Sequence, residues 1–205
     1  MGRIILYTPW DTQPQEPVQA AAGGPLGLVY GGQYRGTDNL SWGLVNTSTE
    51  VISPIGKARS FSRSASSALL APVPSVSLTN ITLFGVFRSR TVGQPINQAI
   101  ISLGSATNDR IILYLNGNKP AMFSGNSIIS ASQASLTTSI TNPNAWIVVV
   151  GVISSATLRK VWASEPMSSP LFWETASDTV SVSPGNATVA AISGYYNGGA
   201  LDAFT

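Results

Sequence analysis

The pattern of hydrophobic and polar positions centres on one apolar run, residues 145–153, which reads Ala-Trp-Ile-Val-Val-Val-Gly-Val-Ile. Asn142-Pro143-Asn144 precedes this run and Ser154-Ser155 follows it. The run is β-branched at most positions, contains no polar residue and is bounded by turn residues. It therefore predicts a strand in the middle of a sheet, with both of its faces largely covered.

Other apolar or alternating runs, each bounded by Gly, Asn, Pro or Ser, predict further strands. They cover residues 51–62, 68–74, 81–88, 99–104, 110–115, 121–124, 158–163 and, as the last strand, 188–194. The prolines in 68–74 assign that run to a sheet edge, and the Ser/Thr/Ala-rich stretch 127–141 predicts an edge strand followed by a long loop. Asn116-Gly117-Asn118 predicts a tight hairpin turn. Because no stretch of ten residues has capped helical periodicity, the pattern predicts an all-β antiparallel sandwich or barrel over residues 46–205.

Residues 1–45 differ from the rest of the chain and predict an extended N-terminal arm. A short strand-like run, Arg3–Thr8, is followed by a proline-rich stretch, 9–17, that favours extended backbone over helix or central strand. Such an arm takes its stability from packing on a neighbouring subunit or on the chain's own sandwich, and the sequence leaves these two alternatives open. The residues that we expect to make these contacts are Trp10, Pro14, Pro17, Tyr30 and Tyr34.

Composition removes several classes of function. Charged residues make up 10% of the chain, against about 25% in a typical domain, and the net charge is only +2 with scattered basic residues, so we expect no nucleic-acid partner. The chain has no cysteine and no histidine, which excludes disulfides, thiolate metal sites and Ser-His or Cys-His catalysis. The N-terminal run is too short for a signal peptide or a membrane span, so we expect synthesis in a cytoplasm and no membrane partner.

Several of these strands, taken in order, resemble concanavalin A-like lectin/glucanase domains of the laminin-G and pentraxin type. The matching segments are Gly56–Phe61 with Ile81–Phe87, Ile100–Gly104 with Arg110–Gly117, Trp146–Val152 with Leu158–Trp162, and Ile192–Gly199. The resemblance covers about residues 50–205 and implies an antiparallel jelly-roll β-sandwich. The family's final strand has no full counterpart here. Either Ala200–Thr205 is a stub of that strand, or the arm or a neighbouring subunit supplies it.

Candidate sites are few. Glycoside hydrolysis needs two carboxylates at a fixed separation, and the acidic residues here are scattered, so we expect no enzyme activity. Asp109 and Asp202 are the best candidates for a calcium site, although turn aspartates usually bind their own backbone, and we therefore expect no cofactor. Tyr195, Tyr196 and Asn197, in a Gly-rich loop, are the best candidates for stacking on a sugar, with loop packing or a subunit contact as the alternative. The larger aromatics expected in the core or at an interface are Trp10, Trp42, Trp162 and Trp173.

Three functions follow from these observations. The first is a structural or interaction protein of a large assembly, such as a bacteriophage or virus particle, where it would be a capsid decoration or tail-associated protein. Its partners would be copies of itself and other virion proteins, and its location the virion. The second is a carbohydrate-binding module for a cell-surface glycan, and the third, least favoured, is a glycosidase. Fold alone does not choose among them.

Overall fold

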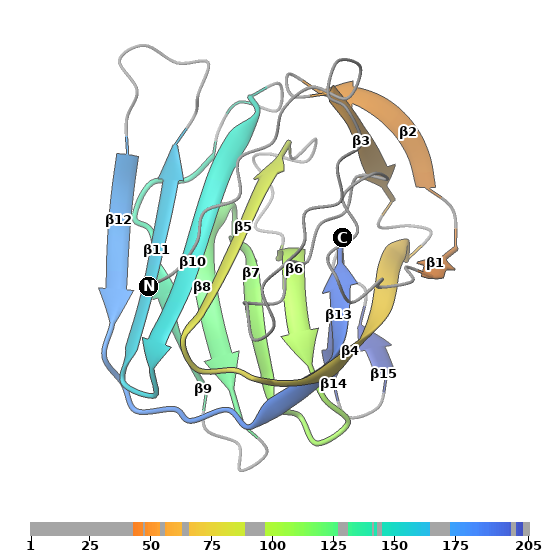
Figure 1. Ribbon diagram of the computed structural model, residues 1–205. Coiled ribbons are helices and arrows are strands. Elements are labelled where there is room, and N and C mark those ends of the chain that lie inside the picture. The colour runs from red at the N-terminus through yellow and green to blue at the C-terminus, as the bar shows by residue number, and fades with distance from the viewer. Residues whose placement is uncertain are drawn as a thin grey trace, which may run out of the picture.

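The chain forms a two-layer antiparallel β-sandwich (Figure 1), which confirms the fold class predicted from the pattern. The structure is a computed structural model. It describes residues 43–46, 48–53, 56–62, 66–88, 97–126, 131–140, 142, 145–164, 173–197 and 200–202. The predicted contact residues of the arm, Trp10, Pro14, Pro17, Tyr30 and Tyr34, lie outside this part of the chain. The jelly-roll path and the likeness to concanavalin A stay predictions. In the described ranges there is no helix that could cross a membrane.

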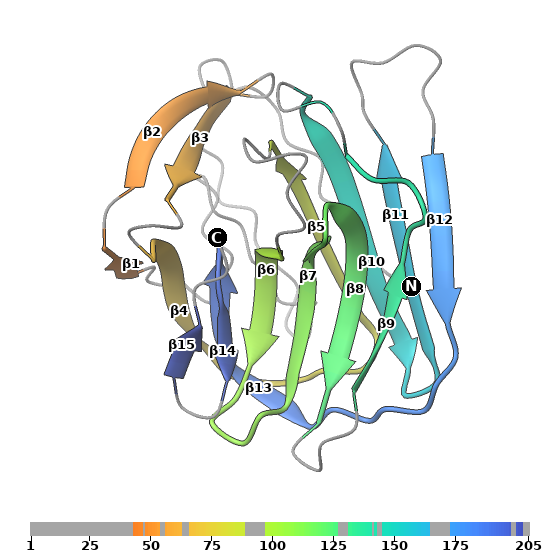
Figure 2. The ribbon, with the colours of Figure 1, turned by 180° about the vertical axis from the view of Figure 1, so that it is seen from behind.

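The larger of the two layers, here the large sheet, is seen from its outer side in Figure 2. Its strands, in spatial order, are β1 (Gly43–Val45), β4 (Ala68–Ser77), β13 (Asn186–Ile192), β6 (Gln98–Gly104), β7 (Arg110–Asn116), β8 (Lys119–Gly125) and β9 (Ala131–Ser135). All the pairings in this sheet are antiparallel. The Ser/Thr/Ala-rich stretch therefore supplies the edge strand β9, as predicted.

The other layer, the small sheet, contains the apolar run with which the sequence pattern begins. Its strands, in spatial order, are β12 (Trp173–Asp178), β11 (Leu158–Ser164), β10 (Ile147–Ser155) and β5 (Ile81–Phe87). β10 lies between β11 and β5, which confirms the predicted mid-sheet position. Two small hairpins complete the described chain: β2 (Ser48–Ser53) with β3 (Gly56–Phe61), and β14 (Tyr195–Asn197) with β15 (Ala200–Asp202).

The core lies between the two sheets. On β10, Ile147, Val149 and Ile153 are at most 2% exposed and point inward, as expected for every second residue of a strand. They belong to one hydrophobic cluster with Leu113 of β7 and with residues of β8 and β11. The sheets approach closely where β10 has a glycine: a Cβ atom on Gly151 would lie 2.6 Å from Sδ of Met122 and 2.9 Å from Cδ1 of Leu113. The glycine at this position therefore allows the close packing.

The predicted turn between β7 and β8 is confirmed in detail. Asn116 pairs with Lys119 across the hairpin, so Gly117 and Asn118 form a two-residue loop. Their φ angles are 55° and 69°. Two successive positive φ angles match the twist of the flanking strands, and Gly and Asn adopt them at low cost.

Three predicted strand positions differ in the structure. Residues 51–62 form the two strands β2 and β3, with Ser53 opposite Gly56, because Pro54 cannot continue a ladder. β4 is ten residues long and lies inside the large sheet, not at its edge. Its prolines are tolerated because β1 pairs only with Ala68–Leu70, which leaves that side of Pro72 and Pro74 without a described ladder. β13 is not the last strand, because β14 and β15 follow it.

Candidate functional site

Aromatic side chains gather on the outer face of the large sheet. Tyr114 of β7 and Phe123 of β8 face away from the core and pack edge to face, with ring centroids 6.4 Å apart. Arg110, four residues before Tyr114 on β7, places its Cζ atom 5.3 Å from the Phe123 ring centroid and 5.9 Å from that of Tyr195. At these distances the guanidinium is attracted to the faces of both rings. The arrangement is a cationic group held between two aromatic rings.

Two of these rings are largely buried. Tyr114 and Tyr195 are each 8% exposed, and burial raises the pKa of Tyr114 to about 12. The Tyr114 hydroxyl donates a hydrogen bond to Oε1 of Gln133 on β9. Tyr195 thus packs against the sheet as part of β14. The sequence analysis had placed it in a Gly-rich loop, and the structure corrects that placement. Tyr196 and Asn197 also lie in β14, and their role in glycan contact stays a prediction.

Asp109, the first candidate for a metal ligand, joins two turns of the large sheet. Its Oδ1 atom accepts a hydrogen bond from the backbone N–H of Gly185 at 2.9 Å, and its Oδ2 atom accepts one from the Thr107 hydroxyl at 2.9 Å. Asp202 lies in β15. Within the described ranges no group of three or more Asp, Glu, His or Cys residues could hold a metal ion. The carboxylate of Asp109 therefore bonds to the backbone of a distant turn and to the hydroxyl of a neighbouring threonine, whereas the alternative stated from the sequence was a bond to its own backbone.

Replacing Asp109 with alanine is expected to lower the free energy of unfolding by about 1 kcal/mol, because the Gly185 N–H and the Thr107 hydroxyl lose their acceptor. Urea unfolding measures this effect. Asp109→Asn, which keeps an acceptor oxygen, is the matched control and should lose less. The urea midpoint of the native protein should be the same with calcium and with an equal ionic strength of sodium chloride. A calcium-dependent rise that disappears in Asp109→Ala would instead support the predicted metal site.

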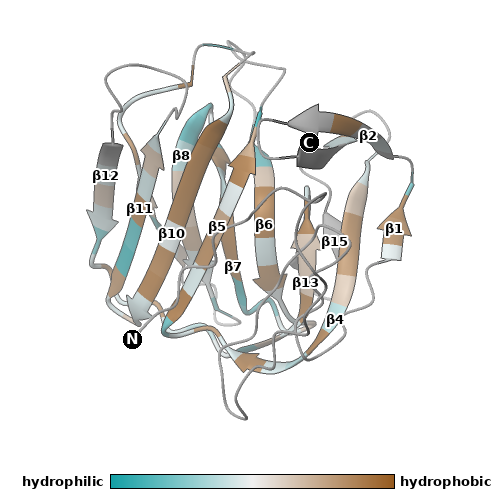
Figure 3. Ribbon diagram, turned by 45° about the horizontal axis from the view of Figure 1, so that its top comes forward, coloured by the Kyte–Doolittle hydropathy of each residue, from teal (hydrophilic) through white to brown (hydrophobic). Residues whose placement is uncertain are grey.

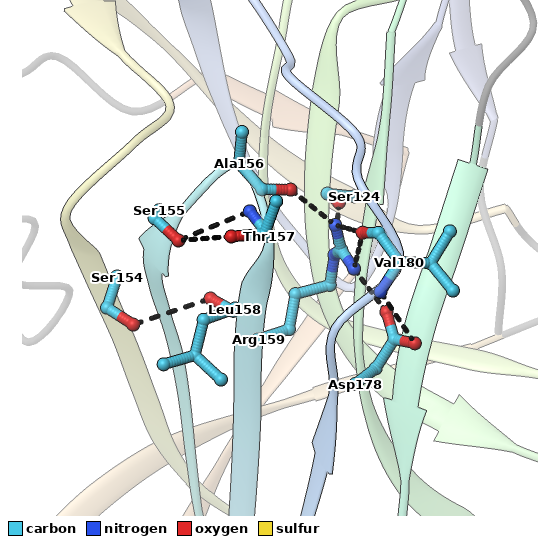
Figure 4. A network of polar contacts seen from close by, with 9 residues as sticks. All are labelled: Ser124, Ser154, Ser155, Ala156, Thr157, Leu158, Arg159, Asp178 and Val180. Atoms are coloured by element: carbon cyan, nitrogen blue, oxygen red, sulfur yellow. Dashed lines mark hydrogen bonds and ion pairs between the residues drawn. The ribbon is translucent and has the colours of Figure 1, made fainter.

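The largest fully buried side chain in the described part of the chain is a cation, Arg159 of β11, which is 0% exposed (Figure 4). Its Nε atom donates to the hydroxyl of Ser124 on β8 at 2.5 Å. Its Nη1 and Nη2 atoms donate to the carbonyl of Val180 at 2.8 and 2.7 Å, and Nη2 also donates to the carbonyl of Ala156 at 3.1 Å. Nη1 completes the set with an ion pair to Asp178 of β12. The guanidinium is therefore surrounded by acceptors.

Asp178 completes a link between the two sheets. Burial raises the pKa of its carboxyl, but hydrogen bonds from Arg159, Ser132 and the Val180 N–H, together with the charge of Arg159, hold the pKa below its usual value. Ser124 and Ser132 belong to the large sheet, whereas Arg159 and Asp178 belong to the small one. The network thus closes one end of the sandwich with polar contacts, and both charged groups have a structural use. The sequence analysis did not single out Arg159. Its position was detectable, because Arg159 is two residues before Val161 and four before Ala163, and alternate residues of a strand face the same side.

The outer face of the small sheet is apolar. Val148, Val150 and Val152 of β10 alternate with the buried core positions and are each partly exposed on the opposite side. Hydropathy colouring shows β10 as hydrophobic along most of its length (Figure 3). A strand of a two-layer sandwich usually places polar residues on its solvent side. β10 departs from that alternation.

The strands on either side of β10 continue this apolar face. Opposite Val148 and Val150 lie Val86 and Phe84 of β5, and opposite Val150 on the other side lies Trp162 of β11. We call Phe84, Val86, Val148, Val150, Val152 and Trp162 the outer apolar face; all six are partly exposed. Its margins are polar, with Thr82 and Lys160 opposite Val152 and with Thr175 and Ser177 on β12. Trp162, which the sequence placed in the core or at an interface, is therefore outside the core.

No family model and no curated protein matches this chain. Its function must accordingly be inferred from the chemistry of its own surfaces. Of the features above, the Arg159 guanidinium and the Asp109 carboxylate are both bonded to other groups of the same chain. The outer apolar face differs from both, because its described side chains are apolar, partly exposed and outside the core.

Proposed function

We propose that this chain is a non-enzymatic structural protein of a large assembly, and that the assembly is a virus or bacteriophage particle in which it decorates the capsid or the tail. The outer apolar face is the observation that carries the proposal. A partly exposed apolar surface rimmed by polar residues is typical of a protein contact site. The low content of charged residues, 10% of the chain, further favours close packing against other proteins.

The described carboxylates support the same proposal. Asp178 is paired with Arg159, and Asp109 is bonded to Gly185 and Thr107, so each is already used to hold the fold together. A glycosidase needs one carboxyl group protonated and a second one ionised across a sugar. The general acid of a glycosidase needs a raised pKa, whereas the pKa of Asp178 is lowered.

Carbohydrate binding is the second candidate function. It is favoured by Phe123, Arg110 and Gln133, which are partly exposed on the outer face of the large sheet and combine a ring, a cation and an amide. Such groups bind sugars by stacking and by hydrogen bonds to hydroxyls. It ranks second because Tyr114 and Tyr195, the larger part of the aromatic surface, are buried.

The test of assembly compares the mass of the native protein in solution with that of a variant lacking residues 1–42. This truncation retains β1, which pairs with β4 although residues 43–45 belong to the predicted arm. We expect light scattering to give a defined oligomer for the native protein and a monomer for the truncated one, with the same circular dichroism spectrum. A native protein that is monomeric would contradict the proposal, and a glycan array would then test the second candidate.

A further inference from the structure

We propose that Asn116 is a site of chemical modification, at which its side-chain amide is lost, and that Asn97 slows this reaction in the folded protein. Asn116 is followed by Gly117, which has no Cβ atom to hinder an attack on the asparagine side chain. The chain contains a second Asn-Gly pair, Asn197-Gly198, so the two sites can be compared in one sample. The inference stands apart from the proposed function, because it concerns the chemistry of one turn.

The reaction is an attack of the backbone on a side chain. The nitrogen of Gly117 loses its proton and forms a bond to Cγ of Asn116, while the bond from Cγ to the amide nitrogen breaks and ammonia leaves. Water then opens the resulting succinimide ring at one of its two carbonyl carbons. One opening gives aspartate, and the other gives isoaspartate, in which the backbone runs through the side chain. In sum, one amide and one water become one carboxylate and one ammonium ion.

The β7–β8 hairpin holds this pair in a conformation that does not favour ring closure. Asn116 lies opposite Lys119 at the end of the ladder, so its backbone is extended. The ring closes only when the Cα–C bond of Asn116 rotates well away from the extended value and brings the Gly117 nitrogen to Cγ. The end of the hairpin must therefore open locally before the reaction can begin.

A distant side chain holds the nitrogen that has to attack. The N–H of Gly117 donates a hydrogen bond to Oδ1 of Asn97 at 3.2 Å. Asn97 immediately precedes β6, which lies beside β7 in the large sheet (Figure 2). In a two-residue hairpin the flanking residues pair with each other, so the N–H of the first loop residue depends on a partner outside the ladder. Asn97 therefore engages the proton that must leave before the nitrogen can attack, and it fixes the peptide plane.

The other loop residue of the turn, Asn118, is anchored from a different part of the chain. Its carbonyl accepts a hydrogen bond from the N–H of Ile140 at 2.9 Å, and the residue is 6% exposed. Gly117 is partly exposed, and Asn97, its hydrogen-bond partner, is exposed. The β8 side of the turn is thus buried and held by backbone, whereas the β7 side is held at the surface by one side chain. Local opening at Asn116 therefore depends on the bond from Gly117 to Asn97.

Mass spectrometry of the peptide that contains Asn116 measures the reaction, because the mass rises slightly when an amide becomes an acid. The native protein is incubated in mildly alkaline buffer and compared with the same protein kept unfolded in guanidinium chloride. We expect Asn116 to react at least about tenfold more slowly in the native protein, because the ring closes only in locally opened molecules. Asn197 gives the reference rate in the unfolded chain, where the two sites should react alike. Equal rates for Asn116 in both conditions, or no reaction at Asn116 in the unfolded chain, would overturn the inference.

Substitutions separate the role of Asn97 from a general loss of stability. Asn97→Ala should raise the rate at Asn116 in the folded protein about fivefold, the factor that corresponds to one hydrogen bond of about 1 kcal/mol. Asn97→Asp keeps an acceptor oxygen and should react no faster than the native protein. Asp109→Ala is the matched control, because it removes a bond beside the opposite end of β7, and it should leave the rate unchanged. An unchanged rate in Asn97→Ala, or an equal increase in Asp109→Ala, would overturn the role of Asn97.

Discussion

Replacement of Arg159 by methionine is expected to lower the free energy of unfolding by roughly 3 kcal/mol, at the lower end of the range for breaking a buried ion pair. Methionine fills much of the same volume but donates no hydrogen bond. The carbonyls of Val180 and Ala156 and the hydroxyl of Ser124 would then lose their donor inside the protein. Asp178 is 15% exposed, so water can reach its carboxylate and limit the loss.

Chemical denaturation with two spectroscopic probes measures this loss. Lys160→Met is the matched control, because Lys160 is the next residue along β11, is partly exposed and faces the other side of the sheet. It should change the free energy of unfolding by less than about 0.5 kcal/mol. Equal effects of the two substitutions would show that the loss comes from the change to methionine and not from the buried network.

Acidification gives a second measure of the same network. The pKa of Asp178 is lower in the folded protein than its usual value, so the ion pair contributes stability above the pKa of the unfolded chain, about 3.9, and this contribution is lost as the pH falls through the folded pKa. The difference in stability between the native protein and Arg159→Met should therefore be constant near neutrality and decrease below about pH 4. A difference that grows on acidification would contradict the assigned ion pair.

Replacement of Gly151 by alanine is expected to lower the free energy of unfolding by about 2 kcal/mol, within the usual range for overpacking a core. The new methyl group would lie 2.6 Å from Sδ of Met122 and 2.9 Å from Cδ1 of Leu113, closer than carbon and sulfur atoms approach in folded proteins. Methionine is flexible and can move aside. Leu113 belongs to the central strand β7 and is fully buried, so the sheets must separate slightly.

A double-mutant cycle tests the cause of this effect. Met122→Ala alone creates a cavity, but in combination with Gly151→Ala the added methyl group occupies part of it, so the double variant should be more stable than the sum of the single losses predicts. Gly43→Ala is the control, because the nearest atom to its added methyl group is the carbonyl oxygen of Leu70 at 3.8 Å. Additive losses in the cycle would show that Met122 and Gly151 do not compete for the same space.

The local pattern of the sequence was sufficient for the fold class and for several elements. β10 could be predicted because an unbroken apolar run has one stable position, the middle of a sheet. The β7–β8 turn could be predicted because Gly117 and Asn118 tolerate the positive φ angles that the hairpin requires. The sequence analysis placed β4 wrongly at an edge. A proline needs only that no strand pairs with its own nitrogen side, and β1 is too short to pair beside Pro72 and Pro74. The length of β1 cannot be read from the sequence of β4.

The candidate sites were less predictable because they depend on contacts between distant parts of the chain. Asp109 bonds to Gly185, and Arg159 to Ser124, across long stretches of sequence. Tyr195 looked exposed because glycines follow it, yet the strand β14 packs its ring beside Arg110. The outer apolar face emerges only when the register of three strands is known, since none of them alone shows which residues stand side by side.

The apolar outer face also affects what happens to a newly made chain. Residues 147–153 form a β-branched segment without charge or proline, the composition that stacks readily into fibrils when it is left uncovered. In the described part of the chain, the outward side of this segment lies beside Phe84, Val86 and Trp162. In the assembly that we propose, synthesis in excess of the available contact sites would therefore lead to aggregation, and rapid incorporation would protect the chain. The yield of correctly folded protein should thus depend on how quickly each copy is incorporated into the proposed assembly.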